Sequence, residues 1–315
     1  MTENVGDIGE FGLIDRITAG LPQRPEVMVG PGDDAALVAV PDGRVVVTTD
    51  LLIEGRHFRR DWSSAHDVGR KAAAQNLSDI AAMGATTTAL TIGLGVPPDT
   101  PVAWVEDLVA GFAAECDVVG ATLAGGDTVR SEEIVIAITA LGDLGGREPV
   151  LRSGARPGDV VALCGRVGWA EAGFRVLSRG FRSPRVLVEA HRVPQVPYDA
   201  GPEAAELGAT AMCDVSDGLL ADLGHVAAAS GVTIDVDVSE VDVPDQIREV
   251  AGALGADPLT WVLTGGDDNA LVATFPAGVA LPERWRMIGA VAEGDPVVLV
   301  AGEPFEGAGG HVHFG

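Results

Sequence analysis

The feature that most constrains this chain is a short pattern of small residues and aspartates that recurs at the edges of apolar segments. Its first copy occupies residues 30–58, where a glycine-rich turn and the apolar run 45–47 lead to Thr48, Thr49 and Asp50. The pattern returns at residues 76–79, 125–128, 214–218 and 264–268. Each copy places carboxylates or hydroxyls beside an apolar segment, so we expect a fold in which several turns and helix starts present oxygen atoms.

Carboxylate and hydroxyl oxygens are the ligands that a hard cation such as Mg²⁺ prefers. Zinc or iron sites call for Cys and His clusters, which this sequence lacks. Any one of these aspartates also fits a solvated turn, and Asp214 and Asp217 also fit the cap of a helix. The recurrence of the pattern favours the alternative, in which copies far apart in the chain bind shared ions.

The size of the chain predicts two domains of α/β type. It has 315 residues, 47% of them apolar, and 42 glycines, which suits a compact protein with substantial cores and many tight turns. The glycine- and proline-rich stretch 142–158 is the predicted boundary. We therefore expect an N-terminal domain at residues 1–145 and a C-terminal domain at residues 146–315.

The charge of the chain restricts its partners. A formal charge of −25 argues against nucleic acid and anionic membranes, because both would be repelled over the whole surface. Phosphorylated small molecules remain compatible with an acidic cleft if divalent ions lie between the two sets of oxygens. Dependence on a metal would then follow from the sign of the charge.

The cysteines and the apolar runs predict a soluble cytoplasmic protein. Cys116, Cys164 and Cys213 are too few and too scattered for a disulfide framework or a zinc site. We expect them to be buried thiols in a reducing compartment. No charged-then-apolar leader opens the chain, and no apolar run approaches the roughly 18 residues of a membrane helix.

Hydrophobic periodicity predicts the order of the main elements. A helix is expected over 66–83, on which Asn76 and Asp79 share a face. Residues 125–128 are expected as a turn before a strand at 134–141, so that the first domain alternates helix and strand three times. The other predicted elements are strands at 86–96, 159–163, 232–238, 270–275, 287–291 and 297–300, and helices ending near 116, 177 and 231. Similar motifs at 76–79 and 214–217 suggest two halves built on related plans.

Two basic residues lie near these motifs. Lys71 is the only lysine of the chain and lies close to the acidic copy at 76–79. It fits either a functional role or packing within its helix. Arg152 lies in the glycine-rich stretch at the predicted boundary, where a guanidinium can grip a phosphate, although solvated loop arginines are commoner.

The motifs that are missing narrow the chemistry. The sequence has no Gly-x-x-x-x-Gly-Lys-Ser/Thr loop, no Gly-x-Ser-x-Gly elbow and no Cys/His pair at a recognised spacing. No residue is therefore a candidate covalent nucleophile. Phosphoryl transfer fits what remains, because it depends on positioning and on neutralising charge. If the acceptor is itself a phosphate, its oxygen is already anionic and a strong general base is unnecessary.

Taken in order, the motifs resemble those of the thiamine-monophosphate kinase family over essentially the whole chain. The matching segments are Gly-Asp-Asp-Ala-Ala at 32–36, Thr-Thr-Asp at 48–50, Glu-Gly at 54–55, His-Phe at 57–58, Lys71 through Asn-Leu-Ser-Asp at 76–79 to Met-Gly-Ala at 83–85, Gly-Gly-Asp at 125–127, Arg-Ser-Gly-Ala at 152–155, Asp-Val-Ser-Asp-Gly-Leu at 214–219 and Gly-Gly-Asp-Asp at 265–268. The wider superfamily, which resembles aminoimidazole ribonucleotide synthetase and selenophosphate synthetase, shares only the general layout and some of the acids.

The resemblance implies an α/β (α+β) protein with a two-domain aminoimidazole ribonucleotide synthetase-like fold. Its N-terminal domain would be a mixed sheet with helices that dimerises, and its C-terminal domain an α/β sandwich. The implied activity is ATP-dependent, in-line phosphorylation of thiamine monophosphate to thiamine diphosphate, with ATP as co-substrate and several Mg²⁺ ions. The implied assembly is a homodimer with the active site near the interface.

The resemblance also implies roles for individual residues. The implied metal ligands are Asp34, Thr48, Thr49, Asp50, Asp79, Asp127, Asp214 and Asp217. The implied contacts to ATP come from Gly126, Asp127, Arg152 and Ser216, and those to the thiamine phosphate from His57, Asp267 and His311.

Two positions depart from the family pattern. The family usually has Gly-Gly-Glu-Asp-Tyr, whereas here Asp267 is one methylene shorter than glutamate and Asn269 replaces the aromatic residue. Near the C-terminus, His311 aligns with a family tryptophan expected to stack on the thiamine, and an imidazole offers less area for stacking. Both changes concern the thiamine pocket more than the phosphate site.

Two alternatives stay open at this point. One is another ATP-dependent enzyme of the superfamily, similar to selenophosphate synthetase or aminoimidazole ribonucleotide synthetase. Selenophosphate synthetases typically carry a reactive cysteine near the N-terminus, and here no cysteine precedes Cys116. The other alternative is a non-catalytic acidic module that binds Ca²⁺, which would bind ions without turning over ATP.

Overall fold

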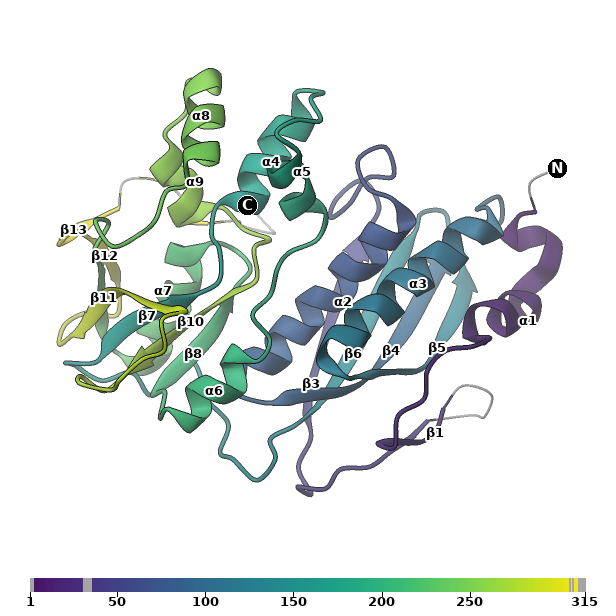
Figure 1. Ribbon diagram of the computed structural model, residues 1–315, viewed down its shortest axis with the longest axis horizontal. Helices are drawn as coiled ribbons and strands as arrows, with labels where there is room; N and C mark the ends of the chain where they lie inside the picture. The colour runs from purple at the N-terminus through teal and green to yellow at the C-terminus, as the bar shows by residue number, and fades with distance from the viewer. Residues whose placement is uncertain (1–2, 31–35, 306, 308, 311–315) are drawn as a thin grey trace. The chain divides into compact units, whose positions relative to one another are not determined.

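The computed structural model describes residues 3–30, 36–305, 307, 309 and 310. The chain divides into two compact units (Figure 1). Unit 1 comprises Met1–Ile80 and Ala85–Gly146, and unit 2 comprises Ala81–Gly84 and Arg147–Gly315. Among the helices of the described residues, none combines the length and the apolar character needed to cross a bilayer.

Unit 1 is built on a four-stranded mixed sheet. Its strands are β3 (Val46–Ile53), β6 (Val135–Asp143), β4 (Thr86–Val96) and β5 (Thr122–Arg130), in that order. β6 is antiparallel to both of its neighbours, and β5 is parallel to β4. The other elements are α1 (Val5–Thr18), α2 (Ala65–Ala82), α3 (Val102–Val119) and the antiparallel pair β1 (Val27–Val29) and β2 (Leu37–Val38).

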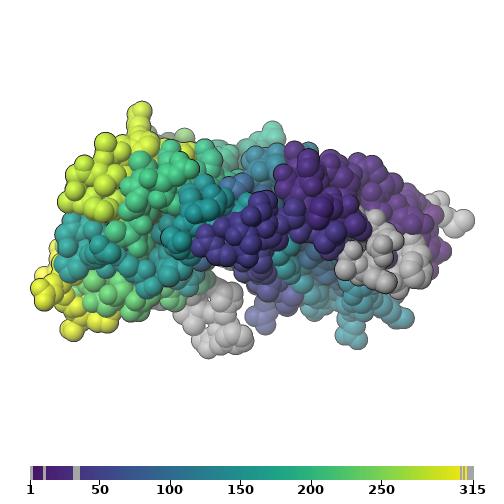
Figure 2. Space-filling model, turned by 90° about the horizontal axis from the view of Figure 1, so that it is seen from below, coloured from purple at the N-terminus to yellow at the C-terminus, as the bar shows by residue number. Residues whose placement is uncertain are grey.

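The helices α2 and α3 lie on one face of this sheet, as Figure 1 shows. Their backbones approach closely at two glycines. A Cβ added at Gly69 would lie 2.1 Å from Leu108 O, and one at Gly111 would lie 2.2 Å from His66 O. Only glycine fits at such a contact, so these two positions fix how α2 packs on α3. The residues of α1, purple in Figure 2, form part of the surface of unit 1.

The opposite face of the sheet is left more exposed. On β6 the residues facing the helices, such as Ile136 and Ile138, are fully buried at 0% exposure, whereas Val47 and Leu51 of β3 are 56% and 50% exposed. Because side chains alternate along strands and paired residues share a face, the register assigns each residue to a face. We call this second face the open face; its members include Val47, Thr49, Leu51, Asp127, Val129, Ala137 and Thr139.

Unit 2 is built on a seven-stranded sheet in the order β13-β12-β9-β11-β7-β10-β8. The strands are β7 (Val160–Cys164), β8 (Ala211–Val215), β9 (Thr233–Val236), β10 (Ala270–Phe275), β11 (Trp285–Ala292), β12 (Val298–Val300) and β13 (Glu303–Pro304). The helices are α4 (Trp169–Ser178), α5 (Arg185–Arg192), α6 (Ala200–Glu206), α7 (Leu219–Ser230), α8 (Asp245–Leu254) and α9 (Pro258–Thr264).

Helices cover both faces of the unit 2 sheet, which gives it two cores. Alternate residues of β7 show this directly: Val161 and Leu163 belong to a core shared with α4, α5, α7, α8 and α9. Ala162 and Cys164 point the other way, into a core shared with α6 and the last residues of α2. The central strands are therefore apolar on both sides, as is usual for a sheet between two layers of helices.

The predicted helix over 66–83 and the strand over 86–96 are confirmed as α2 and β4. The prediction of a turn at 125–128 is wrong, because these residues lie inside β5. A Cβ added at Gly126 would lie 2.1 Å from Ile92 O of β4, so the glycine is needed for close strand pairing. The predicted outline of alternating helices and strands is confirmed in the order α1, β3, α2, β4, α3 and β6, but it misses the strands β1, β2 and β5.

Candidate functional site

One group of candidate residues forms where β3 lies against α2. Thr48 and Asp50 are two apart on β3, so their side chains point to the same face, towards α2. The Thr48 hydroxyl donates to Asp79 Oδ2 at 2.7 Å, and Asn76 Oδ1 accepts from the backbone N–H of Asp50 at 3.0 Å. Asn76 is fully buried. The structure thus brings Thr48, Asp50 and Asp79 together, with Asn76 holding the backbone that carries Asp50.

Thr49 and Asp127 do not join this group, because they lie on the open face of the sheet. The Thr49 hydroxyl donates to the carbonyl of Ile138 at 2.7 Å. Across the sheet, Asp127 pairs with Gly93, Gly93 pairs with Ala137, and Ala137 pairs with Leu51, which is half-exposed. Because paired residues share a face, Asp127 lies on the same face as Leu51. β5 and β3 are also the two edge strands of the sheet. Gly126 precedes Asp127 on β5 and is exposed.

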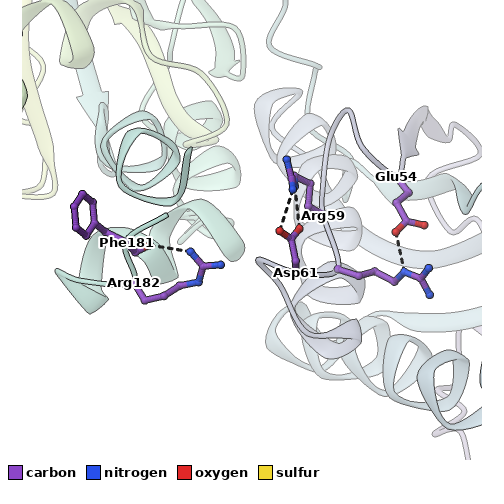
Figure 3. Close-up of polar contacts among 6 residues, drawn as sticks. Glu54, Arg59, Asp61, Phe181 and Arg182 are labelled. Atoms are coloured by element: carbon purple, nitrogen blue, oxygen red, sulfur yellow. Dashed lines mark hydrogen bonds and ion pairs between the residues drawn. The ribbon is translucent and has the colours of Figure 1, made fainter. Parts of the chain in front are cut away.

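His57 lies in the loop that follows β3 and is held by the backbone. The N–H of Ile53 donates to His57 Nδ1 at 2.9 Å. Accepting this bond requires Nδ1 to carry no proton, so the neutral ring carries its proton on Nε2. The same loop contains an ion pair of Arg60 with Glu54 at 2.7 Å. Figure 3 shows this pair, and also the two-bonded pair of Arg59 with Asp61.

A second group forms in unit 2, where the loop after β8 meets the loop before β10. The N–H of Asp267 donates to Ser216 O at 2.8 Å, and the N–H of Asn269 donates to Val215 O at 2.9 Å. A Cβ added at Gly266 would lie 2.5 Å from Ser216 O, so the two loops touch through their backbones. The structure thereby brings Asp214, Ser216, Asp217 and Asp267 to the same end of the sheet.

The loop before β10 has an unusual backbone. Asp267 and Asn269 have φ values of 67° and 53°, in the left-handed region that residues other than glycine seldom adopt. Aspartate and asparagine tolerate it better than most residues. Such strained positions persist where the surroundings impose them, and they are common at functional sites.

Asp222, in the first turn of α7, is a residue that the sequence analysis missed. Its Oδ2 accepts the N–H groups of Asp217 at 3.0 Å and Gly218 at 3.1 Å. Burial, with the nearby Asp214 carboxylate, raises the pKa of Asp222 to about 7. Within the described residues, ligand atoms of Asp217, Asp222 and His225 lie within 4.8 Å of one another. An aspartate four residues after the motif glycine was the available signal, since first-turn acids often bind backbone N–H groups.

Asp268 has a structural environment. It is 6% exposed, and its carboxylate accepts the N–H groups of Gly168 and Ala170 at the start of α4. Burial raises its pKa to about 7, against the lowering effect of these two hydrogen bonds. Asp268 therefore anchors the loop before β10 to α4, while the neighbouring Asp267 is only partly buried.

Arg152 and Lys71 have different surroundings. The segment that carries Arg152 is bonded to the edge strand β8, through a 3.0 Å bond from Met212 N–H to Leu151 O. Ser230 accepts the N–H groups of Gly154 and Ala155 and so holds the same segment. Arg152 itself is exposed. Lys71 is only 3% exposed and lies within α2.

The thiols do not supply a nucleophile. Cys116, Cys164 and Cys213 are free and buried. Burial raises the pKa of Cys116 to about 12 and that of Cys164 to about 11, and it raises the pKa of Cys213 as well. Thiols with such pKa values stay protonated near neutral pH and react poorly.

The residues brought together fit a hard cation. Both groups offer carboxylate and hydroxyl oxygens, the donors that Mg²⁺ prefers, and no cysteine. Asn269 Oδ1, a buried oxygen with no hydrogen-bond partner in the described part of the chain, also lies on the side chain that contacts Asp214. Two further candidates, Asp34 and His311, fall outside the described residues.

Comparison with known proteins gives consistent results. The family model for the AIR synthase related protein, N-terminal domain, matches residues 32–144, and that for the C-terminal domain matches residues 156–277. The chain is 50% identical over 309 residues to a thiamine-monophosphate kinase of Mycobacterium tuberculosis, covering 98% of this chain and 92% of the relative. It is 42% identical to one of Corynebacterium glutamicum, over 92% of this chain and 88% of the relative.

Solved structures agree. A thiamine-monophosphate kinase from Stenotrophomonas maltophilia superposes with a TM-score of 0.82 at 34% identity, covering 95% of this chain and 98% of that one. A structure of AaThiL complexed with AMPPCP and TMP superposes with a TM-score of 0.81 at 33% identity, covering 100% of both chains.

Proposed function

Because the chain belongs to the thiamine-monophosphate kinase family, within the AIR synthase related proteins, we propose that it phosphorylates thiamine monophosphate to thiamine diphosphate with ATP. It is thus a phosphotransferase whose acceptor is a phosphate group. The observation that carries this proposal is the 50% identity to a relative of that activity over 98% of the chain. The relative complexed with AMPPCP and TMP supports both co-substrates.

The proposed metal ligands are carboxylates in each unit: Asp50 and Asp79 in unit 1, and Asp214 and Asp217 in unit 2. Bound Mg²⁺ would neutralise phosphate charge during the transfer. The chain's own contribution is orientation, since the Thr48 hydroxyl donates to Asp79. The acceptor oxygen of thiamine monophosphate is already anionic, so no residue has to remove a proton from it.

The proposed substrate contacts use the remaining candidates. Arg152 and the backbone of Gly126 are exposed and would bind ATP phosphates, together with Ser216. His57, with its proton on Nε2, would donate to the phosphate of thiamine monophosphate. We also retain Asp267 as a substrate contact, and Asp34 and His311 as proposals that rest on the family resemblance.

Substitution of the acids in unit 1 tests this site. Asp50→Asn and Asp79→Asn keep the size of the side chain and remove its charge, so both variants should fold and lose thiamine diphosphate formation by at least a hundredfold. The assay supplies Mg-ATP and thiamine monophosphate, with thiamine and an aminoimidazole ribonucleotide precursor as alternative acceptors. Asp61→Asn is the matched control, because Asp61 pairs with Arg59 on the surface of the same unit. Activity near that of wild type in both site variants would refute the assignment.

We also propose that the protein is a homodimer in which the open faces of two unit 1 sheets meet. The support is the apolar character of that face, where Val47, Leu51 and Val129 are 56%, 50% and 54% exposed. Thr49 and Asp127 lie on the same face, so they would act at the subunit interface. A cytoplasmic location is a further proposal, supported by the three free cysteines.

A further inference from the structure

Asn269 is a buried polar residue whose side chain contacts a proposed metal ligand of unit 2. It is 1% exposed and directly follows the Gly-Gly-Asp-Asp motif. Its Nδ2 donates to Asp214 Oδ2 at 3.3 Å. Its Oδ1 is buried, and no donor among the described residues lies within hydrogen-bonding distance of it.

The contact with Asp214 decides which end of the Asn269 amide is Nδ2 and which is Oδ1. If the amide were turned over, Oδ1 would face the Asp214 carboxylate, and two groups that only accept hydrogen bonds would meet. The orientation with Nδ2 towards Asp214 is therefore the one that the surroundings favour. It leaves an amide oxygen buried beside the carboxylate, and a buried acceptor without a donor is unfavourable.

A bound divalent cation would provide the missing partner for the buried oxygen of Asn269. Neutral amide oxygens are ordinary ligands of hard cations, alongside carboxylates. The bond from Nδ2 to Asp214 Oδ2 would fix the carboxylate, as partners of metal ligands generally do. We propose that Asn269 completes the cation site at Asp214, with Nδ2 orienting the carboxylate and Oδ1 contributing an oxygen to the bound cation. This inference rests on the proposed role of Asp214 as a metal ligand.

The proposed contribution to the cation site depends on asparagine at position 269, and it therefore distinguishes this chain from the family pattern. The family motif ends in tyrosine where this chain has Asn269, and a tyrosine could offer neither the amide donor nor the carbonyl oxygen. The φ of 53° at position 269 also suits asparagine, because few other side chains tolerate the left-handed region. The loss of the aromatic ring is thus accompanied by a polar group in contact with Asp214.

Direct measurement of metal binding tests the proposal. Mn²⁺ is titrated into the full chain without nucleotide, and free Mn²⁺ is followed by electron paramagnetic resonance. Asn269→Gly keeps a residue that accepts φ of 53° and removes the amide. Asn269→Asp keeps the shape and an oxygen but loses the donor. Asp214→Asn identifies the relevant Mn²⁺ site, which is the one that is lost in this variant.

The variants Asn269→Gly and Asn269→Asp should differ in their affinity for Mn²⁺. Asn269→Gly should bind Mn²⁺ about tenfold more weakly at the site that Asp214→Asn removes. Asn269→Asp should bind within about threefold of wild type, because it restores an oxygen ligand. Unchanged binding in Asn269→Gly would overturn the proposal. Equally weak binding in both variants would also overturn it, since the amide N–H alone would then be what matters.

A matched control accounts for loss of stability. Asp257 is exposed and caps α9 in the same unit, accepting the N–H groups of Leu259 and Thr260. Asp257→Ala should lower the unfolding midpoint and leave Mn²⁺ affinity unchanged. If wild type bound no Mn²⁺, both this inference and the proposed metal role would fail. If wild type bound Mn²⁺ and formed thiamine diphosphate while Asn269→Gly matched it, only this inference would fail.

Discussion

At the scale of single residues, Asp268 makes stability depend on pH. Burial raises its pKa from 3.8 to about 7. The folded protein therefore keeps the proton up to about pH 7, whereas the unfolded chain releases it near pH 4. Because the folded state binds more protons between these values, the free energy of unfolding falls as pH rises through this window. Below it the stabilising contribution is complete, and above pH 7 it is lost.

Asp268→Asn should remove this dependence. The variant cannot titrate, so its free energy of unfolding relative to wild type should rise between pH 4 and pH 8, by at most about 4 kcal/mol at roughly 1.4 kcal/mol per pKa unit. Denaturant unfolding of both proteins at several pH values measures the difference between their free energies of unfolding. The contributions of the other titrating groups are the same in both proteins and cancel in this difference. Parallel pH profiles would show that Asp268 stays ionised in the folded protein.

The sequence predicted part of the arrangement at this scale. Helical spacing placed Asn76 and Asp79 on one face of a helix, and the structure brings both to β3. The family motif grouped Thr48 with Thr49, but alternation along a strand sends neighbouring side chains to opposite faces. Asp222 was missed because its role is to bind two backbone N–H groups, which depends on loop geometry that the pattern does not specify.

At the scale of elements, the start of α7 depends on Gly218. Its φ is 129°, and an added Cβ would lie 2.6 Å from Thr264 O. Gly218→Ala should therefore force the loop after β8 away from α9, lower the free energy of unfolding by about 3 kcal/mol and reduce activity. Denaturant unfolding and the thiamine diphosphate assay measure the two effects.

Gly224 provides the control within the same helix. Nothing lies within 4 Å of a Cβ added there. Gly224→Ala should raise stability by up to about 1 kcal/mol, because alanine favours the helix interior. If both variants behaved alike, the close contact between Gly218 and Thr264 would have no energetic importance.

Elements with strong periodicity were predictable, and glycine-rich ones were not. The 18-residue helix α2 and the 11-residue strand β4 follow from their apolar spacing. Residues 125–128 carry two glycines, and glycine commonly marks turns. Here Gly126 permits close approach to Ile92 O within a strand pair, and such tertiary pairing is not visible in a local pattern.

At the scale of the whole molecule, the open face determines the expected assembly. Stable interfaces bury on the order of 800 Å² per partner around an apolar centre. Leu51 lies on β3 and is 50% exposed. Leu51→Glu would place a charge within the proposed interface, so the dimer should dissociate at micromolar concentration. Sedimentation velocity should then report a mass near 32.2 kDa in place of twice that value.

Val118→Glu is the matched control, because Val118 is 62% exposed on α3, which packs on the other face of the sheet. It should stay dimeric and active. Asp127 lies on the open face with Leu51, so dissociation of Leu51→Glu should also reduce thiamine diphosphate formation at least tenfold while unit 1 stays folded. A monomeric variant with full activity would show that Asp127 acts without a partner subunit. A variant that stayed dimeric would show that the subunits associate through another surface.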